Sequence, residues 1–316
     1  MKLLFFLFCI IYGLSGSAAG QKPVPQRTPT PAEINRARLE QQRRTDEQFE
    51  RLRNISEHSS DNRLRINPFA YKNIEIVYRK LTKRELEILA PLEEDERKYA
   101  EFLRLPNTGL TKLAADKGCA DSTTIIMATA DCLAFTMPGA GNSYSFRTRN
   151  YRIPRLADVT FTENSFQATG ARLHGIFVKI GDVPLEQVNL QTKGMDFLNA
   201  FKPEADFQKA KEIDRQFSEG IEKNGFLYRR ALRALDDTTY VLRSVAYRGK
   251  YFRAASGITY NELDFDKRSD VIVAFRIVRR HEDGAVTILW KQLAKQVSPK
   301  TKWEDTEKSS DFFRKN

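Results

Sequence analysis

Basic and aromatic residues alternate in two stretches of the chain, and their types and spacing could bind an anion. Arginine presents a planar fork of donors that fits carboxylates and phosphates, and tyrosine adds a ring face for stacking. The first stretch covers residues 144–152, where a regular strand would direct Arg147 and Arg149 to the same side. The second covers residues 247–253, where a strand is expected to pass into a loop.

We expect the two stretches to form one surface for an anionic ligand. The predicted residues are Arg147, Arg149, Tyr151, Arg152, Tyr247, Arg248, Lys250 and Arg253. A net charge of +11 at pH 7 favours an anionic partner, either an envelope polymer or an acidic protein. The alternative is a solvated face with no ligand, because antiparallel sheets commonly carry basic residues on the side that faces water.

Sequence motifs for catalysis are missing, so we favour a non-catalytic binding or interaction module. The chain has no Gly-x-Ser-x-Gly elbow, no phosphate-binding loop and no dinucleotide fingerprint. Its histidines, His58, His174 and His281, are far apart and lack metal-ligand spacing, so we expect neither a metal nor a cofactor. The alternative is a secreted hydrolase whose site combines dispersed carboxylates with His174. That histidine shares a predicted strand face with Ile176 and is expected to be a hydrogen-bonded core residue.

The first 20 residues have the order of a secretory signal peptide. Lys2 precedes an apolar run over residues 3–14, and small residues follow at 15–20. An N-terminal membrane anchor is the alternative, but twelve apolar residues are fewer than the roughly 20 that span a bilayer. We therefore expect an extracytoplasmic protein, secreted or periplasmic, with no transmembrane segment in the mature chain. In that location an envelope polymer ranks above nucleic acid as a partner.

Cysteine usage agrees with export. Cys9 lies in the signal peptide, which leaves Cys119 and Cys132 as a pair. An even number of cysteines in an exported chain predicts a disulfide, and two buried thiols are the alternative.

Composition divides the rest of the chain. Residues 21–62 are a proline-rich linker followed by a charged helical arm with few apolar residues. Residues 63–297 are expected to form a single α+β domain, and residues 298–316 a disordered polar tail.

The domain should contain an antiparallel β-sheet core with packed helices. Strands are predicted over 74–78, 144–151, 159–162, 166–169, 173–180, 239–247 and 271–280. Asp283-Gly284 predicts a two-residue hairpin in which Ile277 pairs with Trp290 and the apolar alternation of both strands shares one face. A helix is predicted over 203–223, with its stop at Asn224-Gly225.

Overall fold

The computed structural model describes residues 74–115, 137–162, 164–255 and 258–301. All of them belong to one compact unit, residues 60–316. The predicted signal peptide, the linker and arm, and both cysteines of the predicted disulfide lie outside the described residues.

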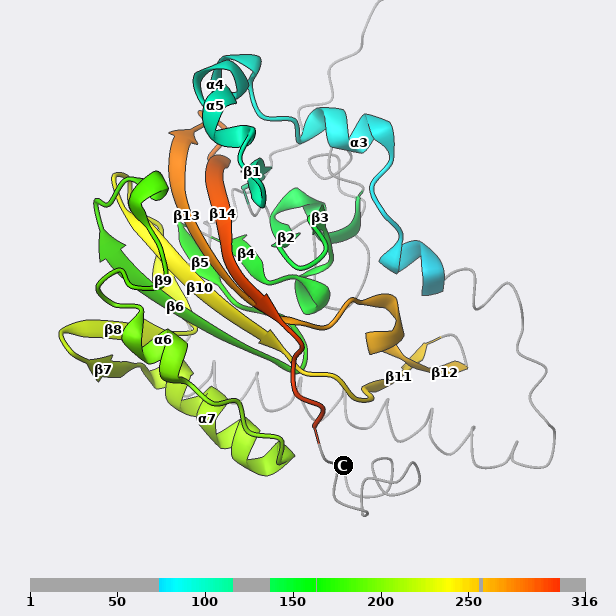
Figure 1. Ribbon diagram of the computed structural model, residues 1–316. Coiled ribbons are helices and arrows are strands. Elements are labelled where there is room, and N and C mark those ends of the chain that lie inside the picture. The colour runs from blue at the N-terminus through cyan, green and yellow to red at the C-terminus, as the bar shows by residue number, and fades with distance from the viewer. Residues whose placement is uncertain (1–73, 116–136, 163, 256–257, 302–316) are drawn as a thin grey trace, which may run out of the picture. The chain divides into compact units, whose positions relative to one another are not determined.

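Antiparallel strands form two sheets and a separate hairpin (Figure 1). The seven-stranded sheet has the order β1 (Thr108–Leu113), β14 (Val286–Gln296), β13 (Asp270–Arg280), β10 (Thr239–Ala246), β6 (Leu173–Gly181), β8 (Phe226–Arg229) and β7 (Ile221–Lys223). The five-stranded sheet has the order β3 (Asn150–Tyr151), β2 (Ser143–Ser145), β4 (Val159–Thr162), β5 (Ser165–Gln167) and β9 (Ala231–Arg233). The hairpin is β11 (Phe252–Ala255) with β12 (Ile258–Asn261).

Short helices surround these strands. The α-helices whose two ends lie within the described residues are α3 (Lys83–Ile88), α4 (Glu93–Lys98), α5 (Ala100–Leu103), α6 (Asp196–Ala200) and α7 (Phe207–Glu219). The 3-10 turns are η2 (Pro138–Gly141), η3 (Pro154–Leu156), η4 (Leu185–Gln187) and η5 (Glu262–Phe265). A capping box begins α3, because the Thr82 hydroxyl accepts from the backbone N–H of Glu85 and the Glu85 carboxylate accepts from Thr82 N–H.

Both faces of the large sheet are buried. One face packs on the small sheet through aromatic side chains, among them Phe146, Phe166 and Phe275. The other face is covered by helices, and Phe217 of α7 lies in that second core with Tyr228 of β8. The predicted fold class, an α+β domain with an antiparallel sheet core and packed helices, is confirmed.

The β13–β14 hairpin keeps its predicted core face but not its predicted register. Ile277 pairs with Ile288, and Trp290 pairs instead with Phe275, because the strands are shifted by two residues and a bulge lies between Ile277 and Arg279. A shift of two leaves every side chain on its face, since strand side chains alternate with a period of two.

The predicted strand over 144–151 is wrong. Residues 143–145 and 150–151 are separate, paired strands, and the four residues between them form a turn. Arg149 adopts φ 52° in that turn. Arg147 and Arg149 therefore do not point from one regular strand, and the predicted alternation of their side chains is lost.

Three other parts of the chain differ from the predictions, in the type of element or in where it begins or ends. Residues 74–78 are helical rather than extended. The helix predicted to end at 223 ends at Glu219, because Gly220 takes φ 104°. Asn224 and Gly225, with φ 52° and 77°, form the β7–β8 hairpin turn instead. The disordered tail was expected from residue 298, but Ser298 and Thr301 are buried, so that prediction does not hold for residues 298–301.

Candidate functional site

Arginines from both predicted stretches converge on one short segment, residues 262–268, which contains η5. Arg147 bonds to Asp266 and to the Lys267 carbonyl. Arg152 donates to the Phe265 carbonyl, and Arg253 donates to Glu262. Both stretches therefore contact the same segment, through bonds that are buried or partly buried.

Arg147 is a buried structural cation. Its side chain and that of Asp158 are both 0% exposed, and its Nε lies 2.6 Å from Asp158 Oδ1. A second bond of 2.6 Å joins its Nη1 to Asp266 Oδ2. Burial alone would lower the pKa of Arg147, but the charges of Asp158 and Asp266 raise it above its usual value. A guanidinium held between two buried carboxylates is not available to a ligand, so this member of the predicted surface is wrong.

The other predicted residues of the first stretch also hydrogen-bond to groups of the protein itself. Tyr151 is buried, and its hydroxyl donates to the Lys112 carbonyl at 2.6 Å. Arg152 is half-buried and donates to the Tyr78 carbonyl at 2.8 Å. Arg149 is the exposed member, and its guanidinium bonds to the Asn107 side chain. This stretch therefore contributes one exposed cation, not a row of three.

A buried carboxylate organises the second stretch. Glu262 is 0% exposed. Arg155 donates to its Oε2 from Nε at 3.1 Å and from Nη2 at 2.8 Å. Arg253 adds a bond of 3.3 Å to the other oxygen, which also accepts from the Tyr78 hydroxyl at 2.8 Å. Burial alone would lower the pKa of Arg155, yet Glu262 raises it. Glu262 thus fixes the directions of two partly exposed guanidiniums.

Two partly exposed guanidiniums of this region pack against aromatic rings. The Tyr251 ring contacts two guanidiniums, with Arg155 at 5.1 Å and Arg172 at 5.2 Å from its centre. Arg172 also lies 3.8 Å from the centre of the Phe207 ring at the start of α7. These distances are typical of cation–π contacts.

Lys250 and Phe252 flank Tyr251 in the sequence, and we group them with the cations and rings described above. Lys250 is exposed, and its ammonium lies 5.8 Å from the centre of the Phe252 ring, which is itself 37% exposed. We call this surface the basic-aromatic patch. It consists of Arg155, Arg172, Phe207, Lys250, Tyr251, Phe252 and Arg253.

Two predicted residues border the patch without belonging to it. Tyr247 is buried, so its predicted place on a binding surface is wrong. Its hydroxyl lies 3.2 Å from His174 Nδ1. Arg248 is exposed, and its Nε donates to the Ser298 carbonyl at 2.8 Å. The patch therefore keeps Lys250 and Arg253 from the predicted set.

Arg155, Arg172 and Phe207 were not among the predicted binding residues. The sequence does carry a signal for the two arginines, because residues 144–180 contain six basic side chains and only two acidic ones. Phe207 has no comparable signal, since its spacing along α7 only indicates a helix face.

His174 is a core residue, as its strand position predicted. It is buried, and its Nε2 lies 2.7 Å from the Ala210 carbonyl of α7. Burial lowers its pKa to about 4. Its ring hydrogen-bonds to the Ala210 carbonyl and the Tyr247 hydroxyl, and to neither Asp158 nor Asp182, two carboxylates that a hydrolase site could pair with it. Asp158 bonds to Ser244 and to Arg147, and Asp182 pairs with Arg276.

No family model matches this chain, and no curated protein and no solved structure is detectably similar to it. Within the described ranges, no group of three or more His, Cys, Asp or Glu side chains is placed to hold a metal ion. None of the helices in the part that the structure describes is both long and apolar enough to cross a membrane.

Proposed function

We propose that this protein is an exported, non-catalytic module that binds an anionic polymer through the basic-aromatic patch. The observation that carries the proposal is an excess of accessible positive charge. Arg155 and Arg253 share one carboxylate, Glu262, which is buried, while Arg172 packs on the Tyr251 ring and Lys250 is exposed beside the Phe252 ring. Asp264 is the next acidic side chain along that segment, and it bonds to the Asn261 amide.

The arrangement of these cations favours an extended anion over a single small one. They come from η3, from the turn before β6 and from the start of β11. A polymer with repeated carboxylate or sulfate groups can contact several such points at once. The guanidiniums packed on rings lose less side-chain entropy on binding than free ones would.

The cation–π contacts also favour an anion over a stacking base. Arg155 and Arg172 already lie over the Tyr251 ring, and Arg172 lies over Phe207. Those rings therefore orient guanidiniums, and the guanidinium forks are what a ligand would contact. This fits acidic polysaccharide better than single-stranded nucleic acid, whose bases need open ring faces.

The alternative hydrolase has less support. His174, its proposed base, uses both ring nitrogens inside the core. The carboxylates Asp158 and Asp182 each face an arginine. A catalytic base needs to reach its substrate proton, and these groups would first have to leave their present partners.

The test compares two charge reversals by fluorescence anisotropy with labelled heparin and labelled polygalacturonate. Lys250→Glu should weaken binding about fivefold, since reversal removes an attraction and adds a repulsion that are each worth about 0.5 kcal/mol at an exposed site. The matched control is Lys193→Glu, also exposed. Lys193 adjoins Gly194, which lies against Ile180 at the opposite end of β6 from Arg172, about 26 Å along the strand.

Added salt should weaken binding of the unmodified protein, because exposed charges are screened beyond about 10 Å at 0.1 M. Equal effects of the two reversals would place binding elsewhere. Salt-independent binding, or none to either polymer, would contradict the proposal.

A further inference from the structure

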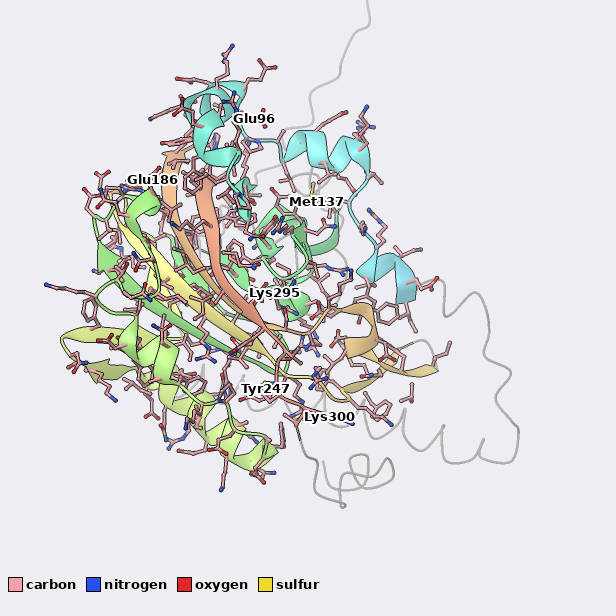
Figure 2. The ribbon with its side chains drawn as sticks, in the orientation of Figure 1. Glu96, Met137, Glu186, Tyr247, Lys295 and Lys300 are labelled. Atoms are coloured by element: carbon pink, nitrogen blue, oxygen red, sulfur yellow. The ribbon has the colours of Figure 1, made fainter. Side chains whose placement is uncertain are left out.

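Residues 298–301 run beside Arg248 and are hydrogen-bonded to it. The Arg248 N–H donates to the Pro299 carbonyl at 2.9 Å, and the Arg248 carbonyl accepts from the Thr301 N–H at 3.0 Å and its hydroxyl at 3.2 Å. Arg248 Nε adds a bond of 2.8 Å to the Ser298 carbonyl. Figure 2 shows Tyr247 and Lys300 close together at this point. We call residues 298–301 the C-terminal strap.

The strap is not a simple continuation of β14. That strand ends at Gln296, and Val297 is 76% exposed. Beyond this exposed link, Ser298 and Thr301 are 0% and 4% exposed. The chain therefore leaves the sheet and is buried again only where it meets Arg248.

Arg248 stands at one end of the segment that carries Lys250. On its N-terminal side, the Tyr247 N–H donates to the Arg172 carbonyl, which ties the strand end to the turn that bears Arg172. The far end is held at Tyr251, whose N–H donates to the Asn261 side chain at 2.8 Å. Gly249 and Lys250 span these two anchored points, and Gly249 takes φ 147°.

We infer that the C-terminal strap positions the Lys250–Arg253 side of the basic-aromatic patch. The inference rests on the proposed function, because it assigns the strap a role in anion binding at that patch. The strap supplies the anchor at Arg248, and Asn261 supplies the anchor at Tyr251. Without the first anchor, Lys250 samples more positions, and ordering it on binding costs more conformational entropy.

Two truncations test the strap with a matched control. One chain ends after Val297 and the other after Thr301, so they differ only in the strap. With labelled heparin as the probe, the chain ending at Thr301 should bind like the full chain. The chain ending at Val297 should bind roughly twofold more weakly, and its plot of log affinity against log salt should lose about one unit of slope, as expected for one lost ionic contact.

The salt slope separates positioning from general instability. A chain that is partly unfolded has fewer active molecules per milligram, but the active ones keep the full slope. If the chain ending at Val297 does not fold, Thr301→Pro in the full chain removes the N–H and hydroxyl bonds to Arg248 and should shift affinity and slope in the same direction. Circular dichroism and melting curves check that each variant is folded.

The outcomes distinguish the two proposals. Equal affinity and equal slope for the two truncations, with heparin bound by both, would overturn the role of the strap and leave the proposed function standing. Failure of the full chain to bind heparin and polygalacturonate would overturn both. Weaker binding by the chain ending at Val297 with an unchanged slope would also overturn the positioning role.

Discussion

Lowering the pH should destabilise the fold through one buried histidine. His174 lies between the Ala210 carbonyl and the Tyr247 hydroxyl. A carbonyl can only accept, so the neutral ring carries its proton on Nε2 and accepts from Tyr247 at Nδ1. Protonating Nδ1 would add a charge inside the core and would require the Tyr247 hydroxyl to turn round.

The size of this effect follows from the pKa. Burial lowers the pKa of folded His174 to about 4, from the usual 6.5. Between these values the unfolded chain binds more protons than the folded one, so stability rises with pH. The stabilisation is fully present above pH 6.5 and is lost as the pH falls toward 4, and it amounts to about 3 kcal/mol at roughly 1.4 kcal/mol per pKa unit.

Urea denaturation of the unmodified protein and of His174→Gln, measured at intervals from pH 7.5 to pH 4, isolates this contribution. Glutamine can still donate to the Ala210 carbonyl but does not titrate. The difference in unfolding free energy between the two proteins should shrink by about 3 kcal/mol as the pH falls. Subtracting one unfolding free energy from the other cancels the contribution of the carboxylates that titrate in both proteins. Parallel curves would show that His174 is not held neutral by the core, and the reasoning would fail.

Four further variants test other parts of the chain. Arg147→Met should lower the unfolding free energy by about 3–5 kcal/mol, because it leaves Asp158 buried without its cation. Arg215→Ala, at a side chain 62% exposed, should change it by less than about 0.5 kcal/mol in the same urea assay. Thr82→Ala should cost about 1 kcal/mol through loss of the α3 capping box, and an unchanged urea midpoint would argue against that cap. The predicted Cys119–Cys132 disulfide is tested by Cys132→Ser, which should lower the melting temperature by several degrees; equal melting of the unmodified protein with and without reductant would indicate free thiols instead.

Apolar periodicity predicted the sheet core well. The alternating residues of β13 and β14 were assigned to one buried face, and that face packs in the core. Their pairing was not predictable from the turn alone. Asp283-Gly284 suggested a two-residue loop, but the bulge after Ile277 depends on packing along the strands.

Local spacing failed where two structures fit the same residues. Ile221 falls at helical spacing from Phe217, and it also fits the short strand β7. Gly220 decides the outcome by ending α7. Asn224-Gly225 then forms the β7–β8 hairpin turn, although the same dipeptide also suits the end of a helix.

The candidate site could be predicted only in part, because charge counting does not reveal distant partners. Arg147 and Asp266 are 119 residues apart in sequence, yet their side chains are in contact and buried. The partners of Arg152 were equally hidden from the sequence, because they are backbone carbonyls of distant residues. Lys250 and Arg253 remain predicted binding residues; the structure places Lys250 beside the Phe252 ring and pairs Arg253 with Glu262.

Binding of an anionic polymer at the basic-aromatic patch is tested most directly by lysine labelling. The protein is acetylated with and without saturating heparin, and the modification of each lysine is measured by mass spectrometry. Lys250 should be protected by heparin, whereas Lys193, which is also exposed and adjoins Gly194 near the far end of β6, should be modified to the same extent in both samples. Labelling of Lys250 that heparin does not change, while heparin is demonstrably bound, would contradict the assignment of the patch as the binding site.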